Sequence, residues 1–198
     1  MKNKIKIVVI DFDGTACEFN YGDFSSSWDA FSNICGIYKK MNQHLRKYYS
    51  NREKEEWMTK EAVKLFKGKT VSLVDRLKPF PYSKGFREFV NSKNGKIMGF
   101  LSSGLNIIVD EAAKELNLDF SISTELEIKN DIITGNVKKI IPLWKKNEIL
   151  SELLKKYNLS SEQVCYIGDN DNDIPCIKLA GIGVAFNPKT EATGKAAK

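Results

Sequence analysis

The segment IVVIDFD, residues 7–13, places two carboxylates directly after a short apolar run. Four branched apolar residues in succession, from Ile7 to Ile10, are typical of a strand buried on both faces of a parallel sheet. Asp11 and Asp13 follow at once, and carboxylates this close in the chain repel each other unless a cation or a shared proton offsets their charge. The segment therefore predicts a strand whose carboxyl end lies at a charged site.

Beyond residue 83 the chain alternates helical and extended patterns. Helices are predicted at 85–92, 105–116, 144–157 and 173–180, strands at 96–101, 119–123, 164–168 and 183–186, and a hairpin at 126–137. This alternation is typical of a parallel sheet covered by helices on both faces, so the expected fold is α/β, with a Rossmann-like three-layer parallel sheet core. Ligands of such sheets bind at the carboxyl ends of the strands.

Between the first strand and residue 80, apolar residues recur at helical spacing, among them Trp28, Phe31, Trp57 and Phe66. Prolines at positions 79 and 81 disfavour helix and mark a boundary. We therefore expect a small helical cap at 15–80, inserted after the first strand, and a core made of residues 1–14 and 81–198. Trp28, Trp57 and Phe66 are expected to be buried, with a pocket-lining role as the alternative for one of them.

Composition excludes several classes of protein. With 198 residues, 42% of them hydrophobic and 28% charged, the chain is expected to fold as one globular domain. Its first apolar run is too short for a signal peptide or a membrane span, which makes the cytoplasm the expected location. The four cysteines lack C-x-x-C spacing, so neither a zinc site nor a disulfide framework is expected.

Basic residues concentrate at 37–69, where ten lysines and arginines face four glutamates. The difference, 10 minus 4, equals the formal charge of +6 of the whole chain. A solvated helix surface is the favoured interpretation of this segment, and a nucleic-acid-binding face is the alternative. The oligomeric state does not follow from the sequence.

Polar side chains follow three of the predicted strands: Asp11 after the first, Ser102, Ser103 and Gly104 after the second, and Asp169, Asp171 and Asp173 after the strand at 164–168. A cluster of Asp11, Asp13, Asp169 and Asp173 would be strongly repulsive without a hard divalent cation, and Mg²⁺ is the ion that a few carboxylates bind together with substrate phosphate. Hydroxyls and backbone N–H groups just ahead of a helix suit a phosphate group. Lys146, at the start of the next helix, would add a positive charge.

These motifs together resemble a known family. DFDGT at 11–15, the serine after the second core strand, the lysine in WKKNEIL and GDNDND at 168–173 are similar to the four motifs of the haloacid dehalogenase-like (HAD) phosphohydrolases. The likeness covers nearly the whole chain and is strongest to the phosphoserine phosphatase-like branch, whose helical cap lies between the first two motifs. It implies a Mg²⁺-dependent phosphomonoester phosphatase that acts on a small phosphorylated metabolite, with phosphoserine as one candidate.

The resemblance also implies a role for each residue. Asp11 would be the nucleophile that becomes an aspartyl phosphate, and Asp13 would be the general acid and base. Mg²⁺ would be held by Asp11, the backbone carbonyl of Asp13 and Asp169, with Asp173 behind them. The phosphate group would be bound by Ser102, Ser103, Gly104, Lys146 and Asn172.

Two pairs of neighbours compete for one role each. Ser102 is favoured over Ser103 because it directly follows the predicted strand, and Lys146 is favoured over Lys145 by its spacing to the apolar residues that follow.

More than one substrate and more than one reaction are also compatible with the sequence. Phosphoserine-specific members of the branch carry a glutamate shortly after the first motif, where this chain has Asn20 with Glu18 nearby. They also carry a cap arginine, where this chain has Ala62 or Lys64. The alternative functions are phosphotransfer to a second metabolite by a mutase-like enzyme, and a non-catalytic phosphate- or nucleic-acid-binding module on the same fold.

Overall fold

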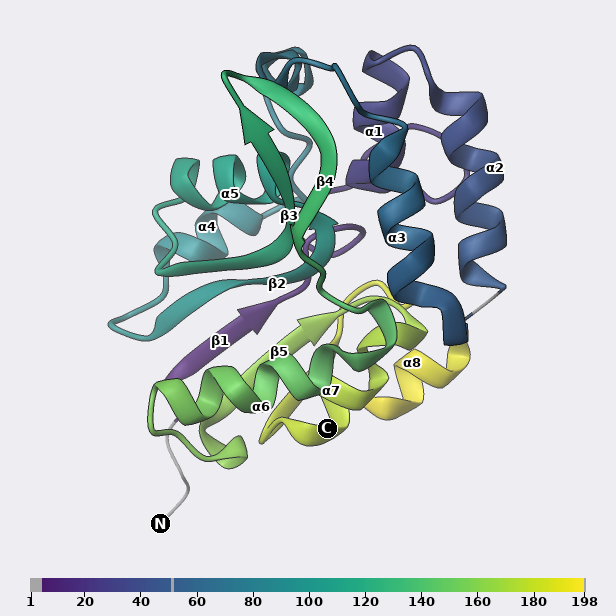
Figure 1. The fold of residues 1–198 in the computed structure, drawn as a ribbon. Helices are drawn as coiled ribbons and strands as arrows, with labels where there is room; N and C mark the ends of the chain where they lie inside the picture. The colour runs from purple at the N-terminus through teal and green to yellow at the C-terminus, as the bar shows by residue number, and fades with distance from the viewer. Residues whose placement is uncertain (1–4, 51, 198) are drawn as a thin grey trace.

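A mostly parallel sheet forms the centre of the protein, in a computed structural model that describes residues 5–50 and 52–197 (Figure 1). The strand order is β4-β3-β2-β1-β5-β6. The strands are β1 Ile7–Ile10, β2 Ile97–Leu105, β3 Phe120–Lys129, β4 Ile132–Lys139, β5 Val164–Gly168 and β6 Ile182–Ala185. β1 pairs in parallel with β2 and β5, whereas β4 runs antiparallel to β3. The predicted α/β class and Rossmann-like sheet are confirmed, with a hairpin forming one edge.

Helices cover both faces of this sheet. α4 Phe86–Asn91 and α5 Asn106–Glu115 lie on one face, and α6 Lys146–Lys156, α7 Ile174–Leu179 and α8 Glu191–Ala196 lie on the other (Figure 1). Because side chains alternate along a strand, Val8 and Ile10 pack with the first pair of helices while Ile7 and Val9 pack with the others. All four are buried, in a strand that the sheet order places between β2 and β5.

Three α-helices, α1 Ser27–Ile34, α2 Tyr38–Tyr49 and α3 Glu55–Lys64, stand beyond the arrow tips of β1 and β5 (Figure 1). α1 starts with a capping box, in which Ser26 Oγ accepts from the backbone of Asp29 and Asp29 accepts in return. The turns η1 Arg52–Lys54 and η2 Val71–Leu77 complete this segment, and η3 Leu143–Lys145, η4 Ser161–Gln163 and η5 Asp171–Asp173 lie in the rest of the chain.

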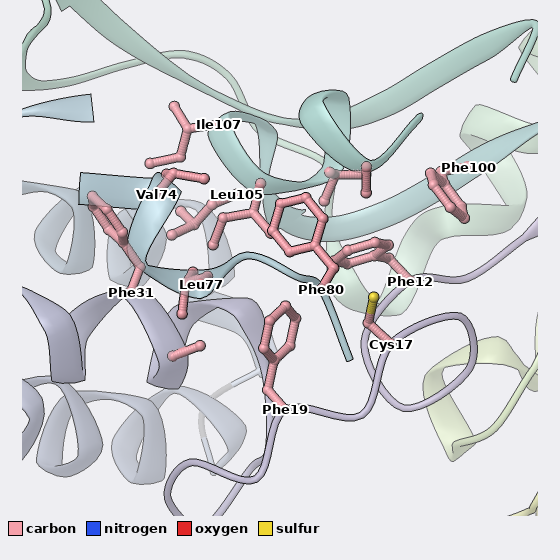
Figure 2. Close-up of a cluster of buried hydrophobic side chains, with 14 of the residues drawn as sticks. Phe12, Cys17, Phe19, Phe31, Val74, Leu77, Phe80, Phe100, Leu105 and Ile107 are labelled. Atoms are coloured by element: carbon pink, nitrogen blue, oxygen red, sulfur yellow. The ribbon is translucent and has the colours of Figure 1, made fainter. Parts of the chain in front are cut away.

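The helical segment and the sheet share a hydrophobic core. Phe31 of α1, Val74 and Leu77 of η2 and Leu105 of β2 belong to one cluster of buried side chains, drawn in Figure 2. Phe66 lies in the same cluster, as predicted, but the prediction that Trp57 is buried is wrong, because its side chain is 57% exposed on α3. The shared packing holds the three helices against the carboxyl ends of the strands.

Strand β2 extends further than the sequence predicts. It continues to Leu105 instead of ending near residue 101, and its pairing with β3 is irregular between Leu101 and Leu105. Ser102, Ser103 and Gly104 lie in this irregular stretch, at the same edge of the sheet as the ends of β1 and β5. Among the described residues, no helix combines the length and the apolar character needed to cross a bilayer.

Candidate active site

The loop after β1 carries the first pair of carboxylates into the interior. The backbone N–H of Asp11 donates to the carbonyl of Ile167 over 2.9 Å, so this residue is fixed between β1 and β5. The chain then turns at Gly14, whose φ is +84°. A Cβ at this position would lie 2.2 Å from Asp169 Oδ2, so the turn requires glycine both for its backbone conformation and for space.

Three buried carboxylates converge beside this loop. One ligand oxygen from each of Asp11, Asp169 and Asp173 lies within 4.8 Å of the others. Lys146 Nζ contacts the cluster, at 3.2 Å from Asp11 Oδ1 and in a hydrogen bond to Asp173 Oδ1. Asp173 also accepts from Tyr166 Oη over 2.7 Å, which helps to fix its carboxylate. The acidic residues of two strand ends are therefore brought together as their positions predict.

The electrostatics of this cluster favour a bound cation. Burial raises the pKa of Asp11 well above its usual range, and the charges of Asp173, Asp169 and Asp13 add to the rise while Lys146 opposes it. Burial also raises the pKa of Asp169. A donor set made of carboxylate oxygens suits a hard divalent cation, which would offset this repulsion, so the residues present fit a divalent metal ion.

Asp13 lies in a different environment, next to the first turn of α1. Its Oδ1 accepts from the backbone N–H of Ser27 over 2.7 Å, and its Oδ2 accepts from Ser27 Oγ over 2.8 Å. Burial raises the pKa of Asp13 to about 6, although the two hydrogen bonds from Ser27 lower it. A carboxyl group with this pKa exchanges a proton readily near neutral pH.

The end of β2 presents hydroxyl and backbone donors to the same space. Ser102 is buried, and its Oγ accepts from the backbone N–H of Gly104 over 3.0 Å, which leaves the hydroxyl hydrogen as a donor. Ser103 Oγ is buried and has no hydrogen-bond partner among the described residues. Gly104 leaves room for its neighbours, because a Cβ there would lie 2.7 Å from Ser27 Oγ. Both serines line the cavity described below, so the choice between them stays open.

The two lysines at 145 and 146 lie in different environments. Lys146 is 1% exposed and contacts the acidic cluster, while its neighbour Lys145 is exposed to solvent. Burial lowers the pKa of Lys146, but Asp11 and Asp173 outweigh that effect, so the pKa lies above its ordinary value and the group stays charged. Asn172 is buried and lines the cavity near the cluster.

Sequence reasoning missed three residues of this site. Ser27 holds Asp13 through the two hydrogen bonds given above. Thr15 Oγ1 donates to Asp169 Oδ1 over 3.2 Å. Lys189 Nζ lies 2.7 Å from Asp169 Oδ2, and its backbone N–H donates to the carbonyl of Asp169 over 2.8 Å. Lys189 follows β6, which is parallel to β5, but it lies in the loop beyond the end of that strand, where no local pattern indicates a site residue.

A cavity of about 450 Å³ lies between the strand ends and the helical segment. One side holds the carboxylates and lysines described above, and the other is formed by residues of α1, α2 and α3 and of the loop before α1. The candidates for the substrate-binding positions, Ala62 or Lys64 and Asn20, differ in whether they reach this cavity. Ala62 lines the cavity, Lys64 is exposed and pairs with Glu61, and Asn20 is exposed outside it.

Comparison of the sequence with known proteins identifies a family. A sequence model described as haloacid dehalogenase-like hydrolase matches residues 8–178. A phosphoserine phosphatase of Archaeoglobus fulgidus is 29% identical over 188 residues, which cover 93% of this chain and 53% of that protein. One of Methanocaldococcus jannaschii is 26% identical over 193 residues, which cover 96% of this chain and 89% of that protein. The chain thus spans about half the length of the first relative and most of the second.

Solved structures agree on the fold. A HAD-family hydrolase of Salmonella enterica serovar Typhi superposes with a TM-score of 0.82 at 20% identity and covers 97% of this chain and 66% of that one. A structure described as a phospho-aspartyl intermediate analogue of phosphoserine phosphatase gives a TM-score of 0.76 at 24% identity, with 98% of this chain and 92% of that one covered. The four motifs, the family match over most of the chain and the shared fold agree, and the chain therefore belongs to the haloacid dehalogenase-like hydrolase family, with phosphoserine phosphatases among its relatives.

Proposed function

We propose that this protein is a Mg²⁺-dependent phosphomonoester phosphatase that acts on a small phosphorylated metabolite through an aspartyl phosphate on Asp11. The observation that carries the proposal is the convergence of a buried carboxylate cluster, the separate carboxyl group of Asp13 and the charged Lys146 at one cavity. The relatives named phosphoserine phosphatase support a phosphoric monoester hydrolase. A pure binding module has no use for this arrangement, because it concentrates repulsive charge without benefit.

In the first step, a carboxylate oxygen of Asp11 attacks phosphorus while the bond from phosphorus to the ester oxygen breaks. Asp13 gives its proton to the departing oxygen, for which a pKa of about 6 is well suited. Lys146 and the donors of Ser102, Ser103 and Gly104 hold the phosphoryl oxygens, where charge stabilisation is the main contribution. The products of this step are the free alcohol and the aspartyl phosphate.

In the second step, water attacks the phosphorus of the aspartyl phosphate and Asp13 takes a proton from it. The bond from phosphorus to the Asp11 oxygen breaks, so inorganic phosphate leaves and the carboxylate is restored. Asp11, the backbone carbonyl of Asp13 and Asp169 would hold Mg²⁺, with Asp173 behind them. The bound ion would supply positive charge that offsets the carboxylates and the phosphate.

We further propose that residues 15–80 act as a cap over a core of residues 1–14 and 81–198. The cavity between the two parts supports this division, since its walls come from both. A cap of this kind would exclude water during phosphoryl transfer and contact the leaving group. The free thiols of all four cysteines support a reducing compartment, the cytoplasm, as the location.

Substitution of the nucleophile tests the function. Asp11→Asn keeps the shape of the side chain but removes the nucleophilic oxygen, so release of phosphate from p-nitrophenyl phosphate with Mg²⁺ should fall by at least about 10³-fold. Chelation of the metal should abolish activity of the unaltered protein. Undiminished turnover by Asp11→Asn, with circular dichroism showing the same fold, would contradict the proposal.

A further inference from the structure

The two sides of the cavity differ in chemistry. Of the described residues that line it, two are cationic, Lys146 and Lys189, and both are ion-paired with carboxylates of the acidic cluster. The side formed by the helical segment has six apolar or aromatic residues, Phe24, Trp28, Leu45, Tyr48, Tyr49 and Ala62, and four polar ones, Asp23, Ser25, Ser26 and Thr59. In the proposed mechanism the phosphate binds at the charged side, so the leaving group lies against these six side chains.

We call the side formed by the helical segment the wall. The charged side chains of helix α3 point away from it. Thr59 and Ala62 line the cavity and are buried. Lys60 and Lys64 point outward instead, where they pair with Glu56 and Glu61 and have side chains that are 53% and 62% exposed. The helix therefore brings a methyl and a hydroxyl group, but no cation, to the leaving group.

The one acidic residue of this wall already has partners. Asp23 forms an ion pair with Arg46 and accepts from Asn42 Nδ2 over 2.9 Å. Its carboxylate is thus occupied at the mouth of the cavity, and Arg46, which pairs with it, is exposed rather than lining the cavity. The wall provides no uncommitted carboxylate for an ammonium group and no uncommitted cation for a carboxylate among its described residues.

The aromatic residues of the wall are held in place by contacts with neighbouring residues. Tyr48 Oη donates to Glu55 Oε1 over 2.6 Å, and Trp28 Nε1 donates to the carbonyl of Ser103 over 3.2 Å. Tyr49 stacks on Phe24, with ring centroids 4.6 Å apart and planes 12° from parallel. Rings fixed in this way form a surface that is ready for an apolar or aromatic group before substrate binds.

We propose that the site selects phosphomonoesters whose leaving alcohol is uncharged and aromatic or apolar, and that it discriminates against a zwitterionic amino acid such as phosphoserine. The inference rests on the proposed function and names the substrate class of that same site. An amino acid leaving group would bring one ammonium and one carboxylate to a wall that pairs neither, and a buried charge without a partner is strongly disfavoured. A benzyl or phenyl group instead buries apolar surface against the rings.

The test compares two esters of primary alcohols, benzyl phosphate and O-phospho-L-serine, by kcat/KM with Mg²⁺ present. We expect benzyl phosphate to be preferred by at least about tenfold. Equal or better turnover of phosphoserine would overturn this inference while the phosphatase function stands. Absence of turnover for both esters and for p-nitrophenyl phosphate would overturn the function and, with it, the inference.

Two variants make the test independent of the intrinsic reactivity of the esters. Ala62→Arg places a cation on the wall, so the ratio of kcat/KM for phosphoserine to that for benzyl phosphate should rise by about tenfold or more. Lys64→Met removes an outward cation and should leave this ratio unchanged; a fall in the ratio would show that Lys64 binds the carboxylate and would overturn the proposal. If Ala62→Arg does not fold, the comparison of the two esters by the unaltered protein and Lys64→Met still decide the matter.

Discussion

Gly14 shows how closely single residues are fitted at the start of the site. Its φ of +84° is disfavoured for any other residue, and a Cβ would lie 2.2 Å from Asp169 Oδ2 and 2.6 Å from Lys189 Nζ. Gly85 offers a matched comparison, because its φ is +78° and nothing lies within 4 Å of where its Cβ would be. The pair separates the cost of the backbone conformation from the cost of the contact with the acidic cluster.

We predict that Gly85→Ala lowers the free energy of unfolding by about 1 kcal/mol, which is the conformational cost alone. Gly14→Ala should lower it by more and should also reduce kcat by at least about tenfold, because the new methyl group displaces the Asp169 carboxylate. Urea denaturation and the initial rate of phosphate release measure the two effects. Equal losses of stability in the two variants, with activity retained in both, would refute the proposed crowding at Gly14.

At the scale of elements, the start of helix α1 links the helical segment to the reacting groups. Ser26 caps the helix through Asp29, and the next residue, Ser27, donates twice to Asp13. Neighbouring serines therefore do different work, since one stabilises the helix and the other orients the proposed general acid. A change in the position of α1 would move the hydroxyl group that contacts Asp13.

We predict that Ser27→Ala lowers kcat by about tenfold to a hundredfold, because Asp13 keeps the backbone donor but loses the hydroxyl donor. Ser26→Ala is the control: it removes the cap, so it should lower the free energy of unfolding by about 1 kcal/mol and change kcat little. Stopped assays of phosphate release and thermal unfolding distinguish the two. If Ser26→Ala lost as much activity as Ser27→Ala, the special role of Ser27 would be wrong.

The elements that the sequence predicts well are those with a strong local pattern. The hairpin turn at Asn130 and Asp131 forms as expected, and both residues adopt positive φ, which asparagine and aspartate tolerate. The length of β2 could not be read in the same way. Its last residues, including Ser102, remain extended because of irregular pairing with β3, and this pairing is a tertiary contact that leaves no periodic signal.

The residues of the site also differ in whether local sequence predicts their position. Asp11 and Asp169 were predictable as neighbours because each follows an apolar strand, and strand ends in a parallel sheet meet at one edge. Ser27 and Lys189 were not, because each reaches the site from a segment whose local sequence indicates only a helix start or a loop. Their roles depend on how distant segments pack, which side-chain spacing does not encode.

At the scale of the whole molecule, the acidic cluster joins segments from the full length of the chain. Asp11 follows β1, Asp169 and Asp173 follow β5, and Lys189 follows β6. The ammonium of Lys189 pairs with Asp169 Oδ2, on a carboxylate that we propose as a metal ligand. A divalent cation bound to the cluster would stabilise all of these strand ends at once, and it would compete with Lys189 for the same oxygen.

This competition gives a prediction for stability and for metal affinity. Mg²⁺ at about 100 times its dissociation constant should raise the free energy of unfolding by about 2.7 kcal/mol relative to the protein in chelator. Lys189→Met should be less stable in chelator, because Asp169 loses its cation, and should bind Mg²⁺ about threefold to tenfold more tightly by calorimetry. Lys195→Met, which removes a lysine that pairs with Glu191 at the surface, should change neither quantity. Weaker Mg²⁺ binding by Lys189→Met would instead mean that the ammonium supports the metal site rather than competing with the ion.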